Sequence, residues 1–433
     1  MKAVLFANSD WYLFNFSLAL ARRLKASGYD VLLLSPPGAY GGRLREVGLS
    51  WQPVPMNRQS LNPLRELRLV ARLIGIYRRE KPDIVHHFTI KCVVYGAIAA
   101  TLAGVPARIN AVTGLGHVFT SSSLRARLLR PLVRAMMRWA LTAKRSRLIL
   151  QNSDDVANLG IFADGWKIRL IKGSGVDISR FRPGRKPVLT GETTRVLLAS
   201  RLLWDKGLGE YVEAARRLLG AGLPMRFRIA GAPDPGNPAS IPQAQLDAWA
   251  AEGAVEPLGH VEDMPAELAR TDIFVLPSYY GEGLPRSLIE AAASALPLIA
   301  TDRPGCRDVV SDGENGLIVA ARDAAALAAA IRRLHDNPVW ARKLGQAARN
   351  KALAEFDQRT VISRTLEVYA ELLAINAEMA VIGIHSVRNS WAGLASRARQ
   401  VVRSPAVTAA STAPPAVRTA VTGENDQGIS IRK

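Results

Sequence analysis

Residues 279–291 read YYGEGLPRSLIEA, and this stretch decides how the chain is interpreted. It follows an apolar run, Ile273–Leu276, that has the length of a buried strand, and it leads into a helical pattern from Ser287 to Ser294. Pro285 stands where the first helical turn would begin. Backbone N–H groups from Gly283 to Arg286 would then point out of the helix, in an arrangement that suits a phosphate.

Two glutamates flank this helix start, Glu282 just before it and Glu290 within it. A carboxylate accepts two hydroxyl hydrogen bonds at once, which suits the diols of ribose or of another sugar. The alternative is a helix cap and an ordinary surface glutamate, and for Glu290 alone that alternative is the better one. For the stretch as a whole we favour a ligand site.

A second polar cluster, Ser200–Gly207, also follows an apolar run and precedes a helical pattern. A diphosphate leaving group gains negative charge as its bond to a sugar breaks, so a positive group must be fixed beside it. Many enzymes use a metal ion held by closely spaced aspartates, but the sequence has no Asp-x-Asp pair. Arg201 and Lys206 are the expected replacements, and we expect no metal and no other cofactor. Without the Glu282 stretch, two solvated charges in a loop would be the better interpretation.

Short apolar runs alternate with helical patterns along both halves of the chain, which predicts right-handed βαβ units and parallel sheets. The expected strands are Ala3–Ala7, Val31–Ser35, Pro82–His86, Arg108–Val112, Leu148–Gln151, Thr194–Ser200, Met225–Ala230, Ile273–Leu276 and Leu298–Thr301. The expected helices are Phe14–Ala26, Pro63–Glu80, Val94–Leu102, Leu208–Leu219, Ser287–Ser294, Ala324–His335, Ala341–Ala354 and Thr360–Leu373. A Pro-rich connection, Phe181–Pro187, marks the expected domain boundary.

Composition sets outer limits on the function. The chain has 433 residues, 48% hydrophobic and 22% charged, which is the balance of a globular protein of two domains. The net charge of +20 suits nucleic acid, an anionic membrane surface or phosphate-rich small molecules. Two distant cysteines, Cys92 and Cys306, predict neither a disulfide framework nor a zinc site. No export signal or membrane-spanning stretch is recognised, so we expect a cytoplasmic location.

Several motifs together resemble the family 4 retaining glycosyltransferases of GT-B fold. They are the spacing from Glu282 to Glu290, the Arg201, Lys206 and Gly207 cluster, and Gly175-Val176-Asp177 with Phe181 and Pro183. The resemblance runs from residue 1 to about residue 373. It implies an α/β protein of two doubly wound Rossmann-like domains facing across a cleft, an acceptor-side domain at 1–183 and a nucleotide-sugar-binding domain at 190–357. It also implies that a terminal helix, 358–373, packs back on the first domain. The composition of residues 374–433, basic at first and then rich in Ala, Thr, Pro and Gly, predicts a basic and then disordered tail.

A narrower resemblance concerns the acceptor. Residues 57–63, 86–91 and 113–119 resemble those of bacterial N-acetylhexosaminyltransferases that act on undecaprenyl-diphosphate-linked sugars. The resemblance implies a UDP-sugar donor and a lipid-linked sugar acceptor.

The resemblance also assigns roles within the site. Glu290 would bind the ribose hydroxyls, and Glu282 the hydroxyls of the transferred sugar. Arg201 and Lys206 would hold the diphosphate, assisted by the backbone N–H groups of Gly283 and Leu284. Gly259-His260-Val261 would lie near the uracil, and His117 would face the transferred sugar. Two features depart from the family pattern, namely the additional Gly281 and the lack of a glycine pair in Asn8-Ser9-Asp10.

The remaining histidines and the cysteine are harder to assign. His86 and His87 follow a strand, but a third ligand at suitable spacing is missing, so a metal site is rejected. For His86, core packing is about as well supported as substrate contact. Cys306 is expected to be structural.

Residues 124–147 carry a dense set of basic side chains and no acidic one. On a helix, Arg127, Arg130, Arg134 and Arg138 fall on one stripe. Apolar surface away from that stripe comes from Leu124, Leu128, Leu132, Ala135, Met136 and Trp139. A solvated helix face is the alternative. The density of arginine favours contact of this helix with an anionic membrane surface. We therefore expect a peripheral location on the inner face of the cell membrane.

These resemblances imply an enzyme that moves an N-acetylhexosamine from a UDP-sugar to a lipid-diphosphate-linked saccharide, with retention, in cell-surface polysaccharide or glycan assembly. One alternative keeps the fold and uses a soluble sugar acceptor. Another is a non-catalytic GT-B scaffold, which the intact Arg201, Lys206, Glu282 and Glu290 argue against. A nucleic-acid-binding protein is the third, and no recognised nucleic-acid module supports it.

Overall fold

The first strand shows why both faces of its sheet are buried. In the computed structural model, β1 (Lys2–Phe6) directs Ala3 and Leu5 into one hydrophobic cluster, and Val4 and Phe6 into another. Side chains alternate across a strand, so an uninterrupted apolar run requires a helical layer on each face of a parallel sheet. One face packs on α2 (Leu18–Ala26) and α16 (Gln358–Leu373), the other on α4 (Pro63–Glu80) and α5 (Ile90–Leu102).

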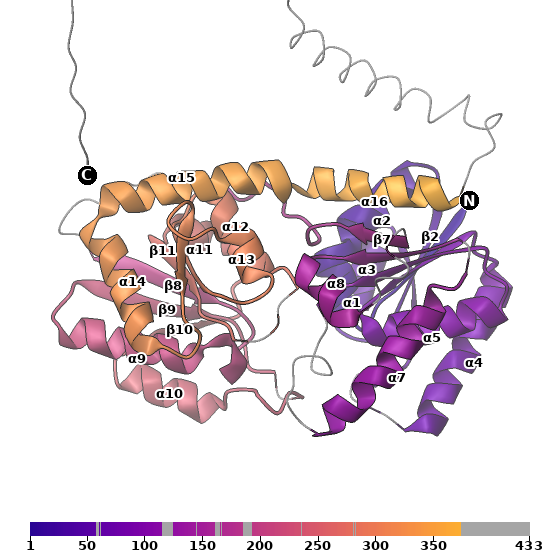
Figure 1. The fold of residues 1–433 in the computed structure, drawn as a ribbon, viewed down its shortest axis with the longest axis horizontal. Coiled ribbons are helices and arrows are strands. Elements are labelled where there is room, and N and C mark those ends of the chain that lie inside the picture. Colours follow the sequence, from indigo (N-terminus) through magenta and orange to yellow (C-terminus); the bar gives the residue numbers. More distant parts are fainter. Residues whose placement is uncertain are drawn as a thin grey trace, which may run out of the picture. The chain divides into compact units, whose positions relative to one another are not determined.

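The structure describes residues 1–57, 60, 62–114, 124–143, 145–160, 165, 167–184, 193–234, 236–279, 281 and 283–373, with only the backbone of 124–126. These residues belong to one compact unit that holds two parallel sheets with helices on their faces (Figure 1). The expected α/β class is therefore confirmed.

The first sheet has seven parallel strands in the order β3-β2-β1-β4-β5-β6-β7. The strand order reverses between β1 and β4, where Leu5 pairs with His86. The other strands are β2 (Asp30–Ser35), β3 (Ser50–Pro53), β4 (Ile84–Phe88), β5 (Ala107–Val112), β6 (Ser146–Leu150) and β7 (Ile168–Leu170). In a doubly wound sheet such a reversal leaves a crevice at the carboxyl ends of the strands.

The second sheet has six parallel strands in the order β10-β9-β8-β11-β12-β13, and it reverses between β8 and β11. Its strands are β8 (Thr194–Ala199), β9 (Met225–Ala230), β10 (Glu256–Gly259), β11 (Ile273–Leu276), β12 (Leu298–Thr301) and β13 (Gly316–Val319). One face packs on α9 (Leu208–Gly220), α10 (Gln243–Ala251) and α14 (Ala324–Asp336). The other packs on α11 (Met264–Ala269), α12 (Arg286–Ala293), α13 (Cys306–Val309) and α15 (Pro338–Glu355).

The last described helix, α16, returns to the first sheet. Val361, Val368 and Tyr369 enter the same hydrophobic cluster as β1 and α2. Glu371 accepts hydrogen bonds from Arg147 of β6, at 2.5 Å, and from Arg169 of β7, at 2.6 Å. The helix therefore completes a core that began with the first residues of the chain.

Every expected strand and helix is present, with shifted ends. The main difference lies in the first helix, which begins at α1 (Asp10–Tyr12) and contains a π-helical turn, η1 (Leu13–Ser17), before α2. The edge strands β3, β7, β10 and β13 were not expected. The first three consist of half-buried or exposed residues without an apolar run, and β13 is only four residues long. The basic helix, α7, spans Leu124–Ala140 and thus ends before Arg147, which lies in β6.

Candidate functional site

A cleft of about 1450 Å³ lies at the carboxyl ends of both sheets. Loops that follow the first sheet's strands supply one wall, and loops that follow the second sheet's strands supply the other. From the first side come Asp10, Tyr12, Tyr40, Thr113 and Gln151; from the second come Arg201, Lys206, Asp234, Val261, Gly283, Leu284, Arg286 and Glu290. This is the place where doubly wound sheets bind ligands.

Glu290 lies on α12 and lines the cleft. Its Oε1 accepts a hydrogen bond from Nε of Arg286, one helical turn earlier, at 2.8 Å. Burial raises the pKa of Glu290, while the charge and hydrogen bond of Arg286 act in the opposite direction. The arginine therefore favours the ionised carboxylate, which is the form that accepts hydrogen bonds from sugar hydroxyls.

Arg286 is a cleft residue that the sequence analysis did not single out. Its guanidinium also donates to the backbone oxygen of Asn15 and lies 5.2 Å above the ring of Phe16. It thus connects the second sheet's helix to the first sheet's first helix. The spacing of four residues to Glu290 was the available signal, because such pairs meet on one face of a helix.

Gly283 and Leu284 lie against the first sheet's strand ends. A Cβ at Gly283 would meet the Thr113 carbonyl and would lie 2.5 Å from Oε1 of Gln151, so this approach requires a glycine. Leu284 N–H donates to the same Gln151 oxygen at 3.0 Å, and Nδ2 of Asn152 donates to the Gly283 carbonyl at 3.3 Å. A diphosphate contact at Leu284 N–H therefore requires that Gln151 give way, and that assignment stays a prediction.

Arg201 and Lys206 lie on the loop after β8. Arg201 is half-exposed and pairs with Asp234 at 3.3 Å. Lys206 is buried, and it ends a short 3₁₀ turn, Trp204–Lys206. Gly207 closes that turn at φ 77°, where a Cβ would collide with the Pro277 backbone. This close approach to the end of β11 directs the loop into the cleft.

The cleft gathers six of the eight predicted site residues: Arg201, Lys206, Val261, Gly283, Leu284 and Glu290. The other two, Glu282 and His117, lie outside the described residues. The roles assigned to all eight stay predictions.

The two histidines of β4 point to opposite faces of the first sheet. His87 is buried between Asn110, 3.0 Å from its Nδ1, and the Tyr77 hydroxyl, 3.2 Å from its Nε2, and burial lowers its pKa to about 4. His86 points to the opposite face, where its Nδ1 lies 3.1 Å from the Tyr369 hydroxyl. Across the part of the chain that the structure describes, no three His, Cys, Asp or Glu side chains group as metal ligands.

Comparison with known proteins identifies the family. Two family models match the chain, Glycosyl transferase 4-like over residues 2–153 and Glycosyl transferases group 1 over residues 193–337. A glycogen synthase of Mycobacterium tuberculosis is 30% identical over 307 residues, which cover 70% of this chain and 72% of the relative. This chain belongs to the group 1 glycosyltransferases.

Two further proteins are similar to this group 1 glycosyltransferase at lower identity. The N,N'-diacetylbacillosaminyl-diphospho-undecaprenol alpha-1,3-N-acetylgalactosaminyltransferase of Campylobacter jejuni is 27% identical over 380 residues, covering 83% of this chain and 96% of the relative. The crystal structure of Anabaena Alr3699/HepE in complex with UDP superposes with a TM-score of 0.68 at 19% identity, covering 86% of this chain and 100% of that one. The expected GT-B fold and glycosyltransferase family are confirmed, and the enzyme is a hexosyltransferase.

Proposed function

We propose that this glycosyltransferase moves an N-acetylhexosamine from a UDP-sugar to a lipid-diphosphate-linked saccharide, with retention and without a metal ion, in cell-surface polysaccharide or glycan assembly. The observation that carries the proposal is that Arg201 and Lys206, on the loop after β8, and Glu290, on α12, line the same cleft. The Campylobacter relative, whose name specifies an undecaprenyl-diphosphate-linked acceptor, supports the acceptor class.

Cationic side chains on the loop after β8 bind the negatively charged diphosphate of the donor. Arg201 exchanges its pairing with Asp234 for a phosphate oxygen, and Lys206 adds a second cation from a buried position. As the bond from the sugar's anomeric carbon to the diphosphate breaks, the negative charge on the leaving oxygen grows, and fixed cations stabilise it most in that state. The leaving phosphate takes the proton of the acceptor hydroxyl, so no strong protein base is required.

Glu290 binds the ribose. Arg286 opposes the effect of burial and favours the ionised form of Glu290, to which two neighbouring hydroxyls can donate. Ribose contacts are the same before and during transfer, so this residue contributes to donor affinity more than to turnover.

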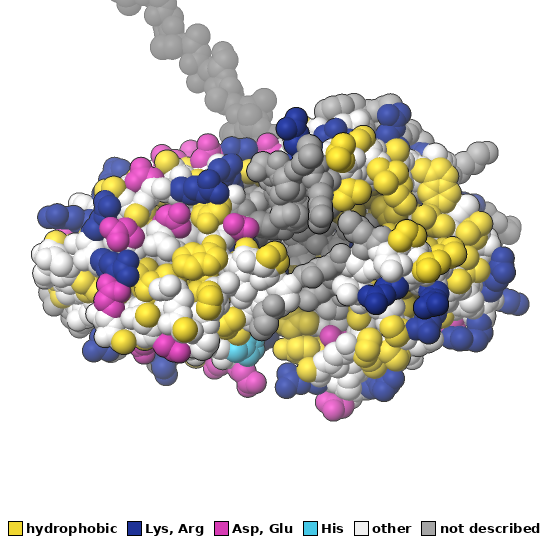
Figure 2. Space-filling view, turned by 90° about the horizontal axis from the view of Figure 1, so that it is seen from below, with side chains coloured by type: hydrophobic (Ala, Val, Ile, Leu, Met, Phe, Trp, Pro, Cys, Tyr) yellow, Lys and Arg dark blue, Asp and Glu magenta, His cyan; other side chains and the backbone are white. Residues whose placement is uncertain are grey.

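The lipid-linked acceptor is reached at a membrane surface through α7. Leu128, Leu132 and Trp139 are among the most exposed large apolar side chains, at 69%, 56% and 42%, and they recur at helical spacing. Arg127, Arg134 and Arg138 are exposed beside them. On α4, Leu64 and Leu67 are likewise exposed. Figure 2 shows hydrophobic side chains gathered on this side of the first domain, with Lys and Arg at their margin.

One correction applies to the expected basic surface. Arg147 is buried in β6 and paired with Glu371, so it does not belong to that surface. Arg134 donates to the Asn158 carbonyl at 2.7 Å. Among the helices that the structure describes, none is long and apolar enough to cross a membrane. A peripheral contact of α7 with anionic lipid, on the inner face of the cell membrane, is the proposal that remains.

The proposal is tested by incubating the full chain with a panel of UDP-sugars and a short polyprenyl-diphosphate-linked sugar, with UDP release and product mass as readouts. We expect UDP release and a product heavier by one N-acetylhexosamine. Transfer to soluble sugars alone would select the soluble-acceptor alternative. Absence of transfer to any acceptor, together with absence of UDP-sugar binding, would select the non-catalytic scaffold.

A further inference from the structure

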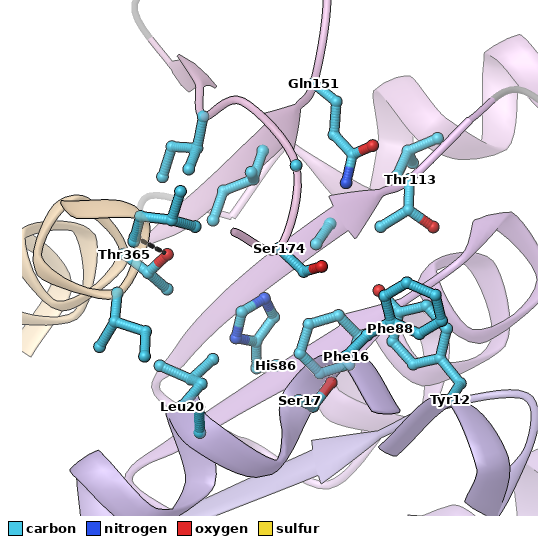
Figure 3. Close-up of a pocket in the computed structure, with 18 residues that line it drawn as sticks. Tyr12, Phe16, Ser17, Leu20, His86, Phe88, Thr113, Gln151, Ser174 and Thr365 are labelled. Carbon is cyan, nitrogen blue, oxygen red and sulfur yellow. Dashed lines mark hydrogen bonds between the residues drawn. The ribbon is translucent and has the colours of Figure 1, made fainter. Parts of the chain in front are cut away.

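A small chamber of about 50 Å³ lies in the cleft wall on the side of the first sheet (Figure 3). It shares Tyr12, Phe16, Thr113, Gln151 and Ser174 with the cleft, so these residues form its mouth. Deeper in, it is lined by Ser17, Leu20, His86, Ile171, Val361 and Thr365. The groups proposed to bind the ribose and the diphosphate of the donor, Arg201, Lys206 and Glu290, come from the opposite wall, so we assign this wall to the acceptor.

Local structure explains why polar and aromatic side chains meet here. The π-helical turn Leu13–Ser17 is wider than an α-helical turn, and such turns often occur at functional sites. It brings Phe16 to the mouth and Ser17 to the interior (Figure 3). His86 comes from the end of β4 and stacks on Phe88, with ring centroids 4.1 Å apart. Helix α16 supplies Val361 and Thr365.

Two polar atoms in the chamber are buried without a partner. Ser17 and His86 are each 2% exposed, and within the described residues neither Oγ of Ser17 nor Nε2 of His86 has a hydrogen-bond partner. Buried polar groups in native proteins are almost always hydrogen-bonded, because an unmade bond is costly. Both residues line the chamber, so an occupant that reaches these atoms could supply the missing hydrogen bonds.

The chamber accepts a neutral group and not a charged one. No Lys, Arg, Asp or Glu is among its lining residues. Burial lowers the pKa of His86 well below its usual value, so its imidazole is neutral. Where the Tyr369 hydroxyl donates to Nδ1, the Nε2 atom carries the hydrogen and can donate. Leu20, Ile171 and Val361 add an apolar floor.

We propose that this chamber binds the acetamido group of an N-acetylated acceptor sugar; the assignment to an acceptor rests on the function proposed above. An acetamido group is neutral and carries a carbonyl acceptor, an N–H donor and a methyl group. Nε2 of His86 donates to the carbonyl, the Ser17 hydroxyl accepts from the N–H, and the methyl group covers the apolar floor. A hydroxyl in the same position leaves that floor uncovered and one polar atom unpaired. The chamber selects the 2-acetamido sugar for this reason.

The test compares two acceptors that differ only at C2, polyprenyl-diphosphate-linked N-acetylglucosamine and glucose. We expect the natural enzyme to favour the N-acetylated acceptor in kcat/KM by at least about tenfold. Ser17→Val, which removes the hydroxyl, should reduce the preference to about threefold or less by raising KM for the N-acetylated acceptor. Ser27→Val, an exposed position at the end of the same helix, is the matched control and should keep the full preference.

A second readout does not depend on transfer. Saturation-transfer NMR with methyl N-acetylglucosaminide should show the acetamido methyl as the most strongly saturated group, and Ser174→Leu, at the chamber mouth, should abolish that signal. If no lipid-linked acceptor is glycosylated while the methyl signal is present and lost in Ser174→Leu, the proposed function fails and the chamber assignment stands. If transfer occurs without preference for the N-acetylated acceptor and without methyl saturation, the assignment is overturned and the chamber holds water alone.

Discussion

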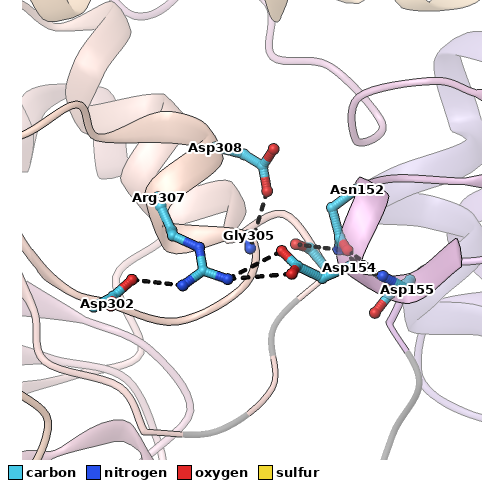
Figure 4. Close-up of polar contacts among 8 residues, drawn as sticks. Asn152, Asp154, Asp155, Asp302, Gly305, Arg307 and Asp308 are labelled. Carbon is cyan, nitrogen blue, oxygen red and sulfur yellow. Dashed lines mark hydrogen bonds and ion pairs between the residues drawn. The ribbon is translucent and has the colours of Figure 1, made fainter. Parts of the chain in front are cut away.

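Arg307 of α13 and Asp154 of α8 (Ser153–Leu159) form an ion pair, with Nη2 3.2 Å from Oδ1, that joins the helix after β12 to the helix after β6 (Figure 4). Arg307 also pairs with Asp302 at 2.6 Å. The Asn152–Gly283 and Gln151–Leu284 hydrogen bonds lie on the same path between the two sheets. The cleft walls are thus held together by polar contacts that can break and re-form without loss of core packing.

This pair predicts a functional effect that is larger than its effect on stability. Both side chains are about two-fifths exposed, and such pairs contribute about 0–1 kcal/mol. Arg307→Met should leave the thermal midpoint within about 3 °C of the natural protein. It should nevertheless raise KM for the donor, because a contact that holds the two walls of the cleft together is lost. Steady-state kinetics and calorimetric melting measure the two effects, and Arg332→Met on α14 is the control. A large loss of stability without a change in KM would contradict the expectation that this ion pair acts on donor binding.

Asp155 predicts a pH dependence of stability. Burial raises the pKa of its carboxyl to about 7, and the charges of Asp154 and Asp308 act in the same direction. An unfolded Asp titrates near 4. The folded state therefore binds more protons between about pH 4 and pH 7, and the free energy of unfolding falls as the pH rises through that window.

Asp155→Asn should remove this decrease. The difference in free energy of unfolding between the variant and the natural protein should therefore shift in favour of the variant as the pH increases from 5 to 8. Urea unfolding at three pH values measures the difference. Asp247→Asn, at an exposed carboxyl on α10, is the control. Parallel pH profiles for the natural protein and Asp155→Asn would show that the carboxyl titrates normally.

Arg201→Ala and Lys206→Ala should each lower kcat by about 10²–10³, which corresponds to the roughly 2.7–4 kcal/mol that one fixed electrostatic partner contributes. Circular dichroism should show an intact fold for both. Arg226→Ala, an exposed residue on β9, should retain full activity. Activity in EDTA should equal activity without it. Near-normal turnover in both single variants, or loss of activity with EDTA, would refute the assignment of the diphosphate to these cations.

Glu290→Gln should weaken UDP binding by about tenfold, or about 1.4 kcal/mol, with a smaller effect on kcat. Titration calorimetry with UDP measures the affinity. Glu213→Gln, an exposed glutamate on α9, is the control. Unchanged UDP affinity in Glu290→Gln would assign the ribose to another group. Glu282→Gln is expected to act mainly on turnover.

Replacing Arg127, Arg130, Arg134 and Arg138 by Gln should reduce co-sedimentation with vesicles of anionic lipid at low salt. Each basic residue near such a surface contributes about 1 kcal/mol. High salt should weaken binding of the natural protein. The control replaces Arg226, Arg332, Arg342 and Lys343, exposed on the second sheet and its helices, so that net charge is matched. Equal binding by the two quadruple variants would show that net charge, and not α7, determines the interaction.

Sequence reasoning located the second sheet's side of the cleft better than the first sheet's side. Arg201 and Glu290 follow predicted strands, and parallel strands end at one edge, so their convergence could be expected. The partners of Leu284 and Arg286, namely Gln151 and Asn15, could not, because packing between distant segments sets these contacts. The π-helical turn at Ser17 was also missed, since one extra residue in a turn barely alters an amphipathic pattern.

The return of α16 to the first sheet reverses the order in which the two halves are finished during synthesis. The second sheet and its helices are encoded without interruption from Thr194 to Glu355. The first sheet emerges earlier, but Val361, Val368 and Tyr369 belong to its core and Glu371 neutralises its buried Arg147. The core around the first sheet, which is synthesised first, is therefore completed only after α16 has been translated.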